Sequence, residues 1–320
     1  MNVFDNQYRT YRIILKIVGL WPYDNSIYVR IQRICVLIYF LIGVLVQIFS
    51  FVKSEISLRN CIVTFSMTFP TVLFCLRYIY CLTLFSYAKL LFDDICTEEH
   101  LLQDTTEIQI QTKYLDISSH IIYIFCWLSF ICAAASCILI LNPVILDVIM
   151  PLNKFRLHYS LIFLSNDRRK CIDIFLVLNS IIIFTFGLLS LICSELLTNI
   201  FSYYICRQFH IVCTPNLPKT DLKLRDIHRV VDIHCHAIEH IHMAFHTNNA
   251  ATQYLLAIIL FVFSFSINLY RLYKALITMD NRMEILGSIL IVIYHLMMAL
   301  YNNHYGQLII NSNHGIFNEL

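Results

Sequence analysis

The histidine-rich segment HRVVDIHCHAIEHIHMAFH, residues 228–246, is the part of the chain whose residue types could most readily perform chemistry. It holds six of the thirteen histidines, with one cysteine among them. Imidazoles four residues apart on a helix can bind one metal ion together. The first hypothesis is therefore a membrane metalloenzyme that uses this cluster to act on lipids.

The spacing of these histidines argues against a shared metal site. His236 and His240 form one pair four residues apart, and His242 and His246 form another. At about 100° per residue the two pairs point about 120° apart on a helix, so they do not converge. Apolar residues lie between them, as on an amphipathic helix. We therefore expect polar helix positions, with no metal, no cofactor and no enzymatic activity, and keep the metalloenzyme as the alternative.

The composition indicates an integral membrane protein. Hydrophobic residues make up 58% of the 320 residues, and charged residues make up 14%. Soluble domains have about 45–50% apolar and about 25% charged residues. The formal net charge is only +2, without a run of basic residues, so we expect no nucleic-acid partner.

Six segments are long and apolar enough to cross a bilayer as helices, which takes about 20 mostly apolar residues. They are residues 34–52, 61–85, 121–141, 172–193, 253–270 and 285–301. These segments are too long and too uniformly apolar to be the strands of a membrane barrel. The sequence predicts an all-α, polytopic membrane helical bundle that forms a single domain over residues 1–320. Basic residues are divided almost evenly between alternate loops, so charge does not fix its orientation.

Several side chains inside these spans suit a pocket for a small apolar molecule. Aromatic rings provide apolar walls, and a few hydroxyl groups provide polar contacts. The candidate ligand-binding residues are Phe65, Thr68, Phe69, Ser136, Phe261, Ser264 and Phe265. The other interpretation is ordinary packing between helices, and the sequence leaves both open.

Arg77 is the one charged residue of the second predicted span. A charge at mid-bilayer costs about 2.5–3.5 kcal/mol on insertion scales, so this guanidinium should face protein or water. It could contact a pore, a cavity or a ligand. It could also make a structural hydrogen bond, or extend to the membrane surface, which lies about eight residues away along the span.

Three stretches around the spans resemble segments of the insect odorant receptors. YRIILKIVGLWPY, residues 11–23, is similar to their Gly-Leu-Trp-Pro element before the first span. VIMPLNKFR, residues 148–156, is similar to the start of their loop between the third and fourth spans. VVDIHCHAIEHI, residues 230–241, resembles the helix that leads into their fifth span, with His234 where the family commonly has a histidine.

Two further stretches resemble the motifs of this family on the cytoplasmic side. YYICRQFHIV, residues 203–212, looks like its His-x-Cys-Gly-Gln-Phe stretch, although Tyr204 and Arg207 replace the usual histidine and glycine. NNHYGQLIINSNHGIFNE, residues 302–319, is similar to its Asn-Tyr-x-Gly-Gln segment. The matching motif residues are Cys206, Gln208, Phe209, Tyr305, Gly306 and Gln307.

The resemblance implies a seven-span receptor with a cytoplasmic N-terminus in the plasma membrane of sensory neurons. It implies the variable subunit of a heterotetrameric, ligand-gated cation channel, formed with the olfactory co-receptor. A small apolar odorant, volatile or cuticular, would bind among the second to sixth spans. Six predicted spans instead of seven lead us to expect that the seventh is absent. A non-conducting truncated receptor product and a related gustatory receptor stay open as alternatives.

Overall fold

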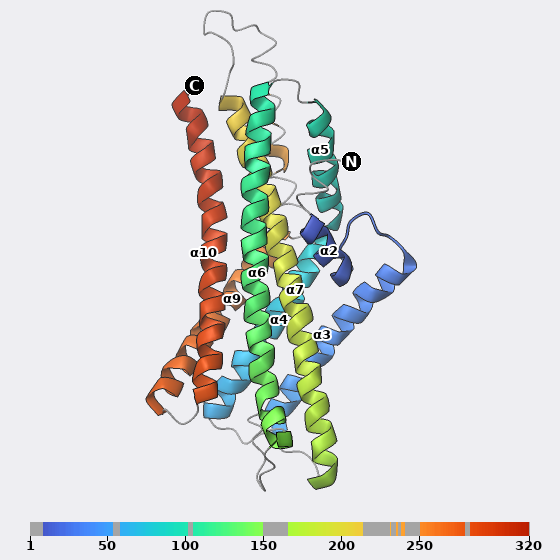
Figure 1. Cartoon of the computed structure of the whole chain (residues 1–320), viewed down its shortest axis with the longest axis vertical. Coiled ribbons are helices and arrows are strands. Elements are labelled where there is room, and N and C mark those ends of the chain that lie inside the picture. The colour runs from blue at the N-terminus through green and yellow to red at the C-terminus, as the bar shows by residue number, and fades with distance from the viewer. Residues whose placement is uncertain are drawn as a thin grey trace, which may run out of the picture.

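The structure is a computed structural model in which long helices form a bundle (Figure 1). It describes residues 9–53, 58–101, 105–149, 166–213, 231, 235, 238–240, 250–278 and 282–319. The helices are α2 (Arg9–Val18), α3 (Ile27–Lys53), α4 (Leu58–Thr83), α5 (Phe85–Leu101), α6 (Thr105–Ile149), α7 (Asn166–Cys213), α9 (Ala250–Thr278) and α10 (Arg282–Glu319). No strand occurs among these residues, so the all-α prediction is confirmed.

The six predicted spans are confirmed as helices long and apolar enough to cross a membrane. Their apolar segments are Ile27–Phe49, Asn60–Thr83, Thr105–Leu139, Val177–Ile211, Ala251–Thr278 and Arg282–His314. Those of α6 and α7 have 35 residues each, which is about 50 Å of helix, whereas a hydrocarbon core is about 30 Å thick. Both helices therefore continue past the membrane, and α6 begins well before the predicted boundary at residue 121.

Helix α7 is the centre of the bundle. It contacts α2, α3, α4, α5, α6 and α10, while α9 packs on α4 and α10. In the most apolar stretch of α7, 56% of the residues are buried, against 17% in α3 and in α9. The side chains of α7 are therefore more completely buried than those of α3 and α9.

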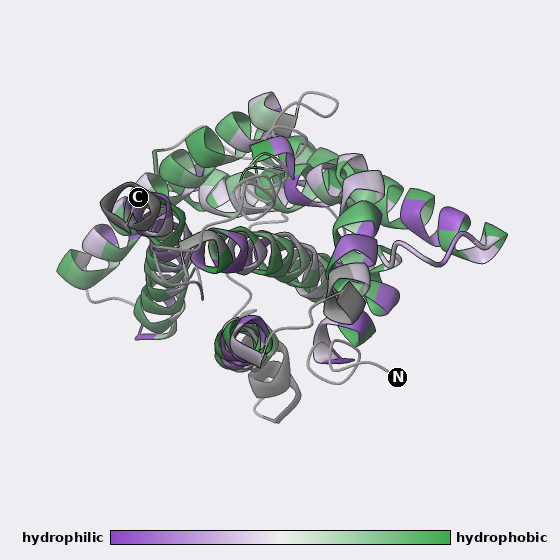
Figure 2. Ribbon diagram, turned by 90° about the horizontal axis from the view of Figure 1, so that it is seen from above, coloured by the Kyte–Doolittle hydropathy of each residue, from purple (hydrophilic) through white to green (hydrophobic). Residues whose placement is uncertain are grey.

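Hydrophobic residues also cover the outside of the bundle (Figure 2). On α3 the exposed residues Ile34, Ile38, Leu41 and Leu45 repeat every three or four positions, so they form one stripe. A water-soluble helix buries such a stripe, whereas a bilayer solvates it. The chain is a multi-pass membrane protein.

The Gly-Leu-Trp-Pro element is a helix end fixed to α3. Gly19 ends α2 with a φ of +78°, a conformation that glycine adopts without strain. The Nε atom of Arg33 donates a hydrogen bond to the Gly19 carbonyl at 2.6 Å. Gln32 Nε2 donates another to the Ile17 carbonyl at 2.7 Å. The start of α3 thus holds the last turn of α2 in place.

The residues after this turn attach α5 to the same corner of the bundle. Trp21 stacks on Phe92 of α5 with ring centroids 6.0 Å apart. The Tyr23 hydroxyl donates a hydrogen bond to Asp93 Oδ1 at 2.6 Å. Burial, and then the bond to Asp93, raise the pKa of Tyr23 above its ordinary value.

Candidate ligand-binding site

The candidate residues on α9 come together around a buried histidine. His295 of α10 places its Nε2 atom 2.9 Å from Ser264 Oγ, and its Nδ1 atom 2.8 Å from the Ile291 carbonyl. A carbonyl can only accept, so Nδ1 carries the proton and Nε2 accepts from the Ser264 hydroxyl. The rings of Phe261 and Phe265 lie 5.2 and 6.0 Å from the imidazole ring.

These four residues, Phe261, Ser264, Phe265 and His295, are named the aromatic site. Ser264 is completely buried, and Phe261 packs against the hydrophobic core. Two apolar walls beside one neutral polar pair match the usual composition of a small-molecule site. The residue from α10, His295, was missed by the sequence analysis.

Beyond the aromatic site, near the end of α9 and the start of α10, Arg271 makes polar contacts with two other helices. Arg271 of α9 donates from Nη1 to Ser66 Oγ of α4 at 2.9 Å. Its Nε atom lies 3.5 Å from Glu284 Oε1 of α10. One side chain therefore joins three helices, and its charge is balanced locally.

The candidate residues on α4 lie apart from the aromatic site. Phe65 is partly exposed, and the centroid of its ring lies 5.7 Å from that of Phe69. Phe69 in turn stacks on the exposed Phe263 of α9, with ring centroids 6.1 Å apart. Thr68 donates its hydroxyl to the Thr64 carbonyl of its own helix at 2.9 Å. This aromatic row faces outward between α4 and α9, and the helix itself satisfies the threonine.

Ser136 is also separated from the other candidates. It is half-buried on α6. That helix packs on α7 and α10 and makes few or no contacts with α4 or α9. The structure thus brings together three of the seven candidates, Phe261, Ser264 and Phe265, and adds His295 to them.

The motif residue Tyr305 lies where α7 and α10 pack together. Asn199 Nδ2 donates to the Tyr305 hydroxyl at 2.6 Å and to the Tyr301 hydroxyl at 3.1 Å. Ser118 of α6 donates to Asn199 Oδ1 at 2.8 Å. The motif tyrosine, Tyr305, therefore belongs to a network that joins three helices through a fully buried asparagine.

The other motif residues differ in burial. Cys206 is buried and interacts with the hydroxyl of Ser312, and Gln208 and Phe209 are buried as well. Gly306 and Gln307 are exposed on α10. His234 lies outside the described residues.

The histidine-rich segment contributes one described histidine, and its position corrects a prediction. His240 is completely buried instead of lying on an exposed polar face. Its Nε2 atom is 3.1 Å from Asp94 Oδ2, and its ring packs against Tyr87 and Tyr204. His228, His234, His236, His242 and His246 lie outside the described residues. Where the chain is described, no three metal-ligating side chains group together.

Arg77 pairs with an acidic residue that the sequence analysis missed. Its Nη2 atom lies 3.3 Å from Oε1 of Glu195 on α7, with the two side chains 6% and 0% exposed. The guanidinium also lies over the ring of Tyr254, 5.3 Å from its centroid. Arg77 therefore faces protein, and the alternative that it extends to the membrane surface is wrong.

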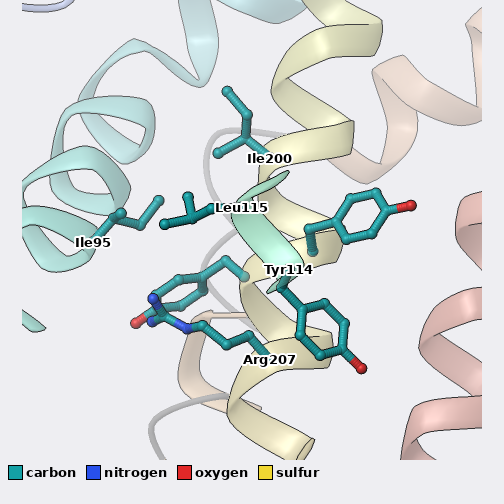
Figure 3. A pocket seen from close by; sticks show the side chains of 7 residues that line it. Ile95, Tyr114, Leu115, Ile200 and Arg207 are labelled. Atoms are coloured by element: carbon teal, nitrogen blue, oxygen red, sulfur yellow. The ribbon is translucent and has the colours of Figure 1, made fainter. Parts of the chain in front are cut away.

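A pocket elsewhere in the bundle is too small for an odorant. It is lined by Ile95, Tyr114, Leu115, Ile200, Tyr203, Tyr204 and Arg207 (Figure 3). Its cavity of about 20 Å³ suits a water molecule. Because α5, α6 and α7 form it, it has no part in the aromatic site on α9 and α10.

Similarity to known proteins is found only in the fold. No protein-family model matches the sequence, and no curated protein matches it. The solved structures include the insect olfactory receptor OR5 from Machilis hrabei in complex with eugenol. That structure has a TM-score of 0.73 and 12% identity, over 92% of this chain and 77% of that chain. Another structure of OR5 has a TM-score of 0.70 and 11% identity, over 98% and 82%. The protein therefore has the fold of an insect olfactory receptor.

Proposed function

We propose that this chain is an odorant receptor subunit that detects a small volatile or cuticular molecule. The observation that carries the proposal is the recurrence of the OR5 fold over 92% of the chain. One of the OR5 structures holds eugenol, a small organic molecule. Because a shared fold does not by itself fix a function, the proposal also needs a site that suits such a ligand.

The aromatic site is the proposed ligand site. Phe261 and Phe265 supply apolar walls, and burying apolar ligand surface against them is worth about 25 cal/mol per Å². Ser264 and His295 supply the polar contacts. Phe65, Thr68, Phe69 and Ser136 stay predictions, and they take part only if the ligand reaches beyond α9 and α10.

In this proposal the ligand gates a cation channel that the chain forms with the olfactory co-receptor as a heterotetramer. A ligand shifts a gating equilibrium only by its difference in affinity for the open and closed states. The N-terminus is proposed to lie in the cytoplasm of a sensory neuron, with the bundle in the plasma membrane.

Cation current in cells that express this chain together with the co-receptor tests the proposal. A panel of volatiles and cuticular lipids is applied to this chain, and to a version with a seventh span joined after Leu320. Current in at least the joined version, reduced by Phe261→Ala, is the expected result. Silence of both versions, with surface expression confirmed, would contradict the proposed function.

A further inference from the structure

Arg77 and Glu195 place two opposite charges in the interior of a membrane bundle. Burying a charge pair is unfavourable unless the remaining donors and acceptors of both groups also find partners. The contact between Arg77 Nη2 and Glu195 Oε1 is 3.3 Å long, and both side chains are almost completely buried. Whether the remaining polar atoms of Arg77 and Glu195 have hydrogen-bond partners therefore decides whether the pair is only structural.

Those remaining atoms are incompletely satisfied. Among the described residues, Nε and Nη1 of Arg77 donate no hydrogen bond. Buried polar atoms in native proteins are satisfied in about nine cases out of ten. A guanidinium is only a donor, so the group that would complete Arg77 must be a hydrogen-bond acceptor.

The surroundings of the pair are aromatic and carry hydroxyl groups. Tyr254 lies under the Arg77 guanidinium and donates its hydroxyl to Asn302 Oδ1 at 3.4 Å. Asn302 in turn approaches the Glu195 carboxylate. Tyr294 interacts electrostatically with both charges, and its hydroxyl also interacts with the Ser129 side chain. These five residues are named the Arg77 centre.

The Arg77 centre lies beside the aromatic site. On α9, Phe261 follows Tyr254 by seven residues, which is two helical turns or about 10 Å. On α10, Tyr294 directly precedes His295 of the aromatic site. A small elongated molecule can therefore place an apolar end on Phe261 and a polar end near Arg77.

We propose that Arg77 binds the carbonyl oxygen of an uncharged ligand whose apolar part packs on Phe261 and Phe265. The ligand class is an aldehyde, ketone or ester, and this inference rests on the proposed function. The charges of Arg77 and Glu195 already cancel, so a carboxylate ligand would leave an uncompensated negative charge in the membrane. An alkane cannot use the free donors at all.

Binding of octane, octanal and octanoate to the purified full chain tests this ligand class. With the wild type we expect octanal to bind about tenfold more tightly than octane, because a hydrogen bond to a charged donor is stronger than a neutral one. We expect octanoate to bind more weakly than octanal.

The test variant is Arg77→Met combined with Glu195→Met. Replacing both members of a buried ion pair with apolar residues of similar size preserves folding, whereas removing one member does not. The preference for octanal over octane should then be lost. Arg271→Met with Glu284→Met is the matched control, because it removes another ion pair, on α9 and α10, and should keep the preference.

The outcomes separate this inference from the proposed function. Equal binding of octane and octanal to the wild type would overturn the carbonyl site and leave an apolar odorant site intact. A preference for octanal that survives in the test variant would also overturn the carbonyl site. So would tighter binding of octanoate than of octanal. Failure of all three probes to bind would overturn the inference, and silence in the current assay would separately overturn the receptor function.

Discussion

Asn199 and Arg77 are two buried polar centres of the same bundle, and they differ in how completely their hydrogen bonds are made. Asn199 makes three hydrogen bonds, to Ser118, Tyr301 and Tyr305, at 2.6 to 3.1 Å. Arg77 makes one ion pair and leaves two nitrogen atoms without an acceptor among the described residues. A satisfied network fixes a structure, whereas an incomplete one has capacity for a ligand.

The largest expected effect follows from breaking the Arg77–Glu195 pair on one side only. Glu195→Ala leaves a buried guanidinium without its counter-charge, so we expect a loss of about 3–5 kcal/mol of stability. Arg77→Met with Glu195→Met should recover most of this loss. Thermal unfolding of the purified variants measures the loss of stability and its recovery. Equal destabilisation by the single and double variants would show that the side-chain volume, and not the charge, matters at this position.

Substituting Asn199, whose hydrogen bonds are complete, should lower the stability somewhat less. Asn199→Leu takes hydrogen bonds from Ser118 and from the two tyrosine hydroxyls, and each buried polar group left alone costs about 1–3 kcal/mol. We expect a total loss of about 3 kcal/mol, with ligand preference unchanged. Asn311→Ala is the control, since Asn311 is exposed and accepts a hydrogen bond from Gln307 within its own helix. A neutral Asn199→Leu variant would contradict the structural role.

Gly187 tests the close packing that holds α4 against α7, and Gly306 on α10 is its control. A Cβ atom at Gly187 would overlap the ring of Phe74, which lies three residues before Arg77 on α4. A Cβ atom at Gly306 would meet nothing within 4 Å. We expect Gly187→Ala to cost about 1–3 kcal/mol through overpacking. Gly306→Ala should stabilise α10 by up to about 1 kcal/mol. The unfolding temperatures should therefore move in opposite directions, and a shared direction would contradict this packing.

The smallest expected effect concerns a partly exposed hydrogen bond far from both centres. The pKa of Tyr23 is raised in the folded state, so its stabilisation is present below about pH 10 and is lost as rising pH ionises the unfolded chain. Tyr23→Phe should cost less than about 1 kcal/mol at neutral pH, because solvent screens exposed contacts. Unfolding across pH 8–11 should show a weaker pH dependence in the variant. An unchanged dependence of stability on pH would show that the ionisation of Tyr23 does not contribute to it.

The sequence predicted the spans well and their ends poorly. Long apolar runs have one stable form in a bilayer, which explains why all six helices were found. Hydropathy reports only the part of a helix in contact with lipid. The polar start of α6, from Thr105, was therefore assigned to a loop.

The grouping of side chains in the aromatic site was predicted in part, for a similar reason. Phe261, Ser264 and Phe265 share one helix, so their spacing already placed them together. His295 lies 31 residues from its partner Ser264, and no local pattern joins the two. Glu195 lies just beyond the predicted end of the fourth span, at residue 193, although an arginine inside a span predicts an acidic partner.

A cryo-electron microscopy structure of the protein with octanal bound is the sharpest test of carbonyl binding at Arg77. We expect the carbonyl oxygen to lie within hydrogen-bond distance of Arg77 Nε or Nη1, and the alkyl chain to pack against Phe261. Octanal bound instead on the outward aromatic row of Phe65 and Phe69 would contradict the ligand site and the role of Arg77 together.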